Sequence, residues 1–157
     1  MRPTAILTLA LLAATGSPAA AGDCDWVSRA LEAAEESEPF ASLRGAERSP
    51  AETTSTLIAP GFAPGSCAIG WYGVGFGEGP ALWCRQSLAP PGLSGAGLAN
   101  VVRACTGLDG ASDPWPGVYR VSFDVGGTRI AIEESGAEGA HVGRWVEVVV
   151  RRLEAAP

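Results

Sequence analysis

The sequence predicts an α+β fold in which two helices pack on one face of an antiparallel sheet, in the element order α-βββ-α-βββ. Three observations lead to this expectation. Two segments repeat apolar residues at spacings of three and four, the period of an amphipathic helix. Six segments are rich in β-branched or alternating apolar residues, as strands are. Residues 118–125 and 128–134 alternate on either side of a Gly-Gly turn, which predicts a β-hairpin with one dry and one wet face.

The first 21 residues are expected to be a cleaved signal peptide. Arg2 supplies a positive start, residues 5–14 form an apolar core, and Ala19 and Ala21 fit an A-x-A cleavage pattern. The apolar run is too short for a stable membrane anchor, which needs about 20 residues. Residues 22–157 then form a single exported domain of ordinary size.

The first half of this domain is predicted to hold one helix and three strands. Residues 23–37 carry an apolar helical stripe. Residues 53–58 are rich in β-branched side chains and predict the first strand. The next two strands, residues 67–72 and 81–88, flank a glycine-rich loop. Residues 44–51, between the helix and the first strand, are expected to be a polar connection.

The second half repeats this order of elements without repeating the sequence. Residues 94–105 are predicted to form the second helix, with Ser94 as its N-cap. In the hairpin that follows, the two-residue turn pairs Phe123 with Ile130 on the dry face. Residues 144–153 close the fold, and their run of three valines favours a strand over a short helix.

The four cysteines predict two disulfides and an oxidising compartment, either the periplasm or the extracellular space. A hairpin of the second and third strands would place Cys67 opposite Cys84. Two antiparallel helices on one sheet face would bring Cys24 near Cys105. We expect these two pairs, and the other two connectivities stay open at this stage. The cysteines are widely spaced and His141 is the only histidine, so no metal site is expected.

The charge balance excludes some classes of partner. Without Arg2, ten arginines remain against 17 acidic residues, which gives the mature chain a net charge of −7. An acidic chain of this kind does not bind nucleic acid or anionic lipid through bulk electrostatics. It would instead steer toward a basic protein partner. The absence of lysine, with abundant arginine, alanine and glycine, is typical of a GC-rich bacterial genome.

No combination of residues predicts catalysis. The single histidine lies in a glycine-rich loop, and no G-x-S-x-G motif occurs. A glycosidase pair could be drawn from Glu78, Asp113, Glu133 and Glu134, but acidic residues are too numerous for that choice to carry weight. The loop at residues 73–79 lacks the lysine and the following helix of a phosphate-binding loop. We therefore expect no catalytic residue and no cofactor.

Aromatic residues beside loops are the remaining candidates for a site. Trp71, Tyr72, Phe76 and Trp115 are expected to form a contact surface, because aromatic side chains bury a large area on binding. The alternative is that they cover the core at the sheet edge. The sequence therefore predicts an exported binding protein of the bacterial periplasm or envelope, for example an inhibitor or an immunity-type protein. The alternative functions are a small hydrolase and a glycan-binding module acting on cell-wall material.

Overall fold

The computed structural model describes residues 21–73, 78–87, 92–113, 115–136 and 143–153. Its elements, in chain order, are α1 Ala21–Ala34, the 3-10 helix η1 Ala41–Leu43, β1 Arg44–Ser49, β2 Glu52–Ser55, β3 Cys67–Tyr72, β4 Gly79–Ser87, α2 Gly95–Thr106, β5 Ala111–Ser112, β6 Val118–Val125, β7 Thr128–Ser135 and β8 Trp145–Arg152. The predicted signal peptide lies outside the described residues, except for Ala21.

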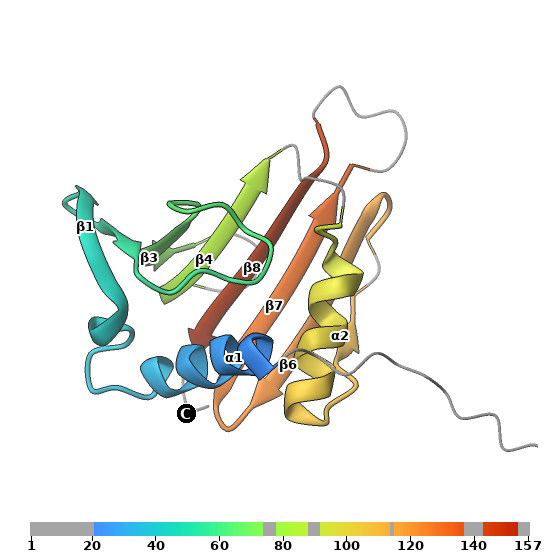
Figure 1. Ribbon diagram of the computed structural model, residues 1–157, viewed down its shortest axis with the longest axis horizontal. Helices are drawn as coiled ribbons and strands as arrows, with labels where there is room; N and C mark the ends of the chain where they lie inside the picture. Colours follow the sequence, from blue (N-terminus) through green and yellow to red (C-terminus); the bar gives the residue numbers. More distant parts are fainter. Residues whose placement is uncertain (1–20, 74–77, 88–91, 114, 137–142, 154–157) are drawn as a thin grey trace, which may run out of the picture.

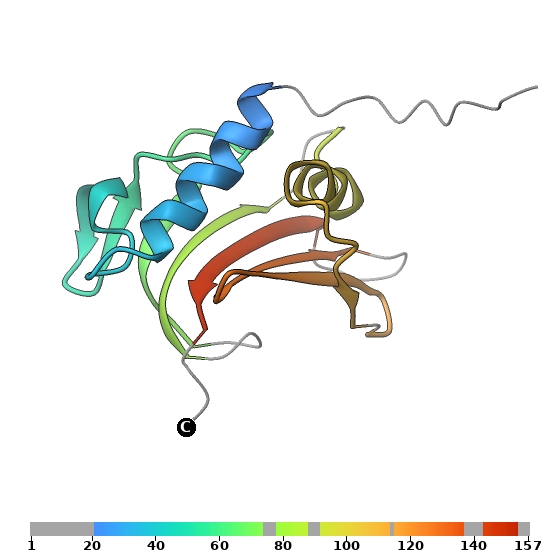
Figure 2. The ribbon, with the colours of Figure 1, turned by 90° about the horizontal axis from the view of Figure 1, so that it is seen from below.

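The strands form one antiparallel sheet in the order β1-β2-β3-β4-β8-β7-β6-β5. Both α-helices lie on the same side of this sheet (Figure 1 and Figure 2), which confirms the predicted fold class. The last strand, β8, lies at the centre and pairs with β4 on one side and β7 on the other. It therefore joins the two halves of the chain into a single sheet.

The two edge strands were not predicted. Residues 44–51 were expected to be a polar connection, but they form β1 and the turn into β2. All six residues of β1 are exposed, and its pairing with β2 contains two irregularities of register. A strand with no buried face has no alternating pattern of apolar residues, so periodicity alone does not reveal it.

The register of both predicted hairpins is confirmed. Phe123 pairs with Ile130 across β6 and β7, and both side chains are buried. Gly126 and Gly127 form the turn with positive φ angles of 57° and 91°, a conformation in which glycine carries little strain. Short turns fix which residues face each other, so local sequence was sufficient here.

The helices cover the apolar, buried face of the sheet. α1 packs on β8, while α2 packs on β6 and β7. The Ser94 hydroxyl accepts a hydrogen bond of 3.0 Å from the Gly97 N–H and caps α2, as predicted. Gly107 ends α2 with a left-handed φ of 72°. The buried apolar core lies between these two layers and includes Val27, Ala30, Phe40, Ile69, Leu82, Leu98, Val102, Val121, Phe123, Ile130, Ile132, Val146, Val148 and Val150.

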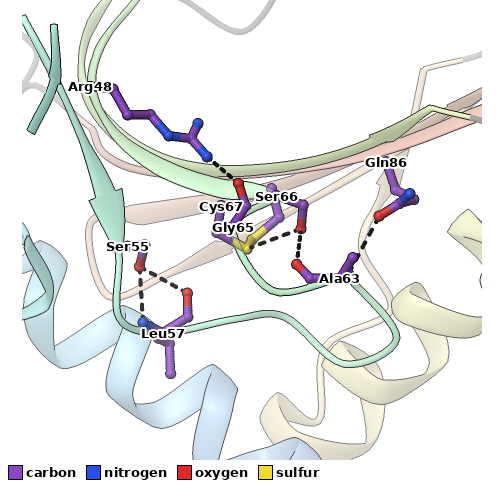
Figure 3. The surroundings of a disulfide bond; sticks show 9 residues. Arg48, Ser55, Leu57, Ala63, Gly65, Ser66, Cys67 and Gln86 are labelled. Atoms are coloured by element: carbon purple, nitrogen blue, oxygen red, sulfur yellow. Dashed lines mark hydrogen bonds between the residues drawn. A yellow bond between two sulfur atoms is a disulfide. The ribbon is translucent and has the colours of Figure 1, made fainter. Parts of the chain in front are cut away.

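A loop completes the covered face beside the helices. Its buried side chains are Leu57, Ala59 and Phe62. Figure 3 shows how hydrogen bonds hold it near the disulfide of Cys67. The Ser66 hydroxyl donates to the Ala63 carbonyl at 2.7 Å, and the Ala63 N–H donates to Gln86 Oε1 at 3.3 Å. This loop of residues 56–66 thus serves as a third covering element.

Both predicted disulfides are confirmed. Cys24 joins the start of α1 to Cys105 near the end of α2, with 5.3 Å between their Cα atoms. Cys67 joins Cys84 directly across β3 and β4, with 4.0 Å between their Cα atoms. Two disulfides indicate an oxidising extracellular or periplasmic environment. Among the described residues, no helix has both the length and the apolar character needed to cross a membrane.

Candidate binding surface

The face of the sheet opposite the two α-helices is the candidate site, and we call it the uncovered face. Among the residues that the structure describes, no helix lies over it, and Figure 2 shows β4 and β8 curving with the helices on their convex side. Strand register assigns the following residues to this face: Ala68, Gly70, Tyr72, Ala81, Trp83, Arg85, Arg120, Ser122, Asp124, Arg129, Ala131, Glu133, Trp145, Glu147, Val149 and Arg151.

Four charged residues cross the uncovered face in one row. Arg85 on β4 pairs with Glu147 on β8, Glu147 pairs with Glu133 on β7, and Glu133 pairs with Arg120 on β6. Directly opposed residues of antiparallel strands have Cβ atoms about 5 Å apart. Two carboxylates are therefore neighbours, with one guanidinium at each end of the row.

Glu133 is held by Arg120. The Arg120 Nε donates to a Glu133 carboxylate oxygen at 3.0 Å, and its Nη2 lies 2.9 Å from the same oxygen. The Nη1 of Arg120 reaches Asp113 at 3.2 Å. Both side chains of the Arg120–Glu133 pair are largely buried, so the charges support each other away from bulk water.

Glu147 is the most buried charged residue on this face, with 5% of its surface exposed. The Tyr72 hydroxyl donates a 3.0 Å hydrogen bond to Glu147 Oε2. Burial raises the pKa of Glu147 above its usual value, and the Glu133 carboxylate adds to this, while Arg85 and the Tyr72 hydroxyl act in the opposite direction. Burial and the Glu147 carboxylate also raise the pKa of Tyr72, so its phenol remains a proton donor.

Aromatic side chains lie beside this charged row. The rings of Tyr72 and Trp83 are 5.6 Å apart in a tilted arrangement. Gly70 makes room for Trp83, since a Cβ atom added at Gly70 would lie 3.2 Å from the indole. The Arg85 guanidinium lies 4.7 Å from the centre of the Trp145 ring, within the range of a cation–π contact.

A second pair of charges lies further along the face. Arg129 donates two hydrogen bonds to the Asp124 carboxylate, both of 2.7 Å. These hydrogen bonds lower the pKa of Asp124 below its usual value. The pair has the two-pronged geometry that guanidinium and carboxylate groups favour. It fixes both side chains on the β6–β7 hairpin.

The structure does not gather Trp71, Tyr72 and Trp115, the three predicted contact residues that it describes, into one patch. Trp71 is 66% exposed at the end of β3, and Trp115 is 62% exposed just before β6. β3 and β6 are four strand spacings apart in the sheet, roughly 19 Å. Tyr72 points to the uncovered face and is half-buried there. Phe76 lies outside the described residues.

Sequence reasoning missed the centre of this surface. Glu147, Arg85, Trp83 and Trp145 were not among the predicted contact residues. They meet only because β8 inserts next to β4, a pairing between strands that are about 60 residues apart in the chain. Their alternation along each strand was visible in the sequence. The missing information was the order of strands in the sheet.

The two carboxylates at the centre of the charged row are both engaged by other side chains. Glu147 has little access to solvent, and the Glu133 carboxylate is engaged by Arg120. A general acid or base must reach the substrate at hydrogen-bond distance. Within the described part of the chain, no group of three or more His, Cys, Asp or Glu side chains is placed to hold a metal ion.

Known proteins give no further guide to this surface. No protein-family model, curated protein sequence or solved structure matches this chain. The function must therefore be inferred from the geometry and chemistry of the chain's own residues.

Proposed function

We propose that the chain is an exported binding protein of the bacterial periplasm or envelope, and that it holds a protein partner on the uncovered face. The observation that carries this proposal is the composition of that face. Trp83, Trp145, Tyr72 and Arg85 lie close to one another on a sheet surface with no helix over it among the described residues. Trp, Tyr and Arg are the residue types that dominate the energy of protein interfaces.

One hydrogen bond and one cation–π contact hold these side chains in place and support the same proposal. Tyr72 is fixed by Glu147, and Arg85 is oriented by Trp145. A side chain that is already held in place loses less conformational entropy on binding. The surface is thus organised before a partner arrives, as tight binding sites are.

The distribution of charge distinguishes binding beside α1 from binding on the uncovered face. Residues 21–43 hold six acidic residues and only Arg29 as a basic residue, so most of the net negative charge lies around α1. The uncovered face, by contrast, has nearly balanced charge. If the chain is an inhibitor or immunity-type protein with a basic partner, that partner would be attracted to the α1 side, and its affinity would fall strongly with added salt. A partner on the uncovered face would depend on salt much less.

The test is capture of the partner by tagged mature protein from a periplasmic extract of the source bacterium. We expect the double variant Arg85→Ala/Trp145→Ala to lose at least tenfold in capture, while Trp71→Ala, which removes an exposed tryptophan on the opposite side of the sheet, retains it. Unchanged capture by the double variant would show that the uncovered face is not the binding surface.

A second set of variants addresses the acidic side. Asp25→Asn, Glu32→Gln and Glu38→Gln combined remove three negative charges from the α1 segment without touching the uncovered face. If capture is lost in this variant and in high salt, but kept by Arg85→Ala/Trp145→Ala, the partner is basic and binds beside α1. The proposal on the uncovered face would then be wrong.

A further inference from the structure

A hollow at one end of the sheet is a separate feature of the molecule. Its volume is about 550 Å³, and it is lined by Trp71, Glu78, Arg151 and Leu153. Ligand sites for small molecules commonly have volumes of about 300–1,000 Å³. The hollow lies where β3 and β8 end and β4 begins, so its walls come from three neighbouring strands and the residues that flank them.

Small residues lie opposite Trp71 and Arg151, the two largest side chains of the hollow. Arg151 is opposite Ala81 across β8 and β4, and Trp71 is opposite Pro80 across β3 and β4. Pro80 has no side chain long enough to cover the Trp71 indole, whereas Ala81 is itself fully buried. The Trp71 indole consequently remains 66% exposed beside the hollow.

The lining of the hollow combines an aromatic ring, a carboxylate and a guanidinium group. The indole supplies a flat apolar surface, the Glu78 carboxylate accepts hydrogen bonds, and the Arg151 guanidinium donates them. One positive and one negative group leave the hollow without net charge. A phosphate ligand requires an excess of positive charge, and a cationic ligand requires an excess of negative charge. The lining favours neither.

We infer that this hollow binds a neutral saccharide. A pyranose ring has one face of C–H groups, which would stack on the Trp71 indole. Its rim carries hydroxyl groups, which donate to a carboxylate such as Glu78 and accept from a guanidinium such as Arg151. This site does not depend on the proposed protein partner, because its stacking residue, Trp71, points to the other side of the sheet, although Arg151 of the lining belongs to the uncovered face.

The inference is tested by saturation-transfer NMR and by titration of tryptophan fluorescence. The probes are chitotetraose, cellotetraose and maltotetraose as neutral oligosaccharides, with tetragalacturonate as an anionic comparison. We expect at least one neutral probe to bind at millimolar concentration or below. Trp71→Ala should weaken this binding about tenfold or more, since an aromatic platform supplies much of the affinity.

Trp115→Ala is the matched control, because Trp115 is similarly exposed at 62% but lies near the opposite edge of the sheet. It should bind the same probe as the wild type does. Glu78→Gln, which keeps an acceptor oxygen but loses the charge, should weaken binding by less than Trp71→Ala. The inference is overturned if no neutral probe binds, if Trp71→Ala binds as well as the wild type, or if only the anionic probe binds.

Discussion

The two disulfides close loops of very different length, and this predicts unequal losses of stability when each is removed. Cys24 and Cys105 are 81 residues apart in the chain, whereas Cys67 and Cys84 are 17 apart. The entropy of loop closure in the unfolded chain gives a stabilisation of about 4.5 kcal/mol for the longer loop and about 3 kcal/mol for the shorter one at 25 °C. The structure adds to this difference. Cys67 and Cys84 lie in a ladder of six residue pairs that persists without the disulfide, while the other disulfide ties α1 to α2.

The variants must remove the bond without opening a cavity. Cys67 and Cys84 are fully buried, so valine at both positions keeps the core filled and suits a strand. Cys24 and Cys105 are only half-buried helix residues, where alanine is adequate. We expect Cys24→Ala/Cys105→Ala to lose about 1.5 kcal/mol more in the free energy of unfolding than Cys67→Val/Cys84→Val.

Urea unfolding of both double variants and the wild type, followed by far-UV circular dichroism, measures this difference. The m value should also rise, and more so in Cys24→Ala/Cys105→Ala, because the unfolded chain without that cross-link exposes more surface. An equal loss in the two variants, or a larger loss in Cys67→Val/Cys84→Val, would refute the reasoning. Native-state contacts of the hairpin disulfide would then outweigh its effect on the unfolded chain.

Two further substitutions test the uncovered face. Because the pKa of Glu147 is raised, the folded state binds this proton more tightly than the unfolded state does. Protonated Glu147 therefore favours folding at low pH, and this stabilisation is lost as the pH rises through the pKa of the folded state. The stability of Glu147→Gln relative to the wild type should therefore increase from about pH 4 to about pH 8 in thermal unfolding, and a flat difference would contradict it. Gly70→Ala should destabilise by about 1–3 kcal/mol, since the added Cβ would overlap the Ala51 carbonyl oxygen. Gly73→Ala is its control, because a Cβ atom there would meet only the Glu78 side chain, at 4.0 Å. An equal loss of stability in both variants would exclude the clash at Gly70 as the cause.

The parts of the fold that were predictable are those decided by neighbours in the chain. The Gly126-Gly127 turn fixed the register of β6 and β7, and the opposition of Cys67 and Cys84 followed from the hairpin of β3 and β4. The Ser94 cap is a similarly local signal. Each of these depends on contacts across a short segment, where geometry leaves few alternatives.

The parts that were not predictable depend on the order of strands. Arg85 and Glu147 face each other because β8 inserts beside β4, and nothing local in either strand specifies that neighbour. The burial of Glu147 has the same origin, since a glutamate on the solvent side of a one-sided sheet is expected to be exposed. Here the Tyr72 hydroxyl and the neighbouring strands enclose it. The site therefore depends on long-range pairing that alternation does not encode.

The central residues of the uncovered face are shielded from solvent, which limits where a partner can contact this face. Val149 and Ala131 are each only 1% exposed, although they belong to the face without a helix. Larger side chains around these small central residues must exclude solvent from them, and Trp83 is the direct cross-strand neighbour of Val149. A partner would thus meet the outer surfaces of the tryptophan and arginine side chains and not the sheet centre. Arg85, which is exposed and stacked on Trp145, is therefore the part of this face most accessible to such contact.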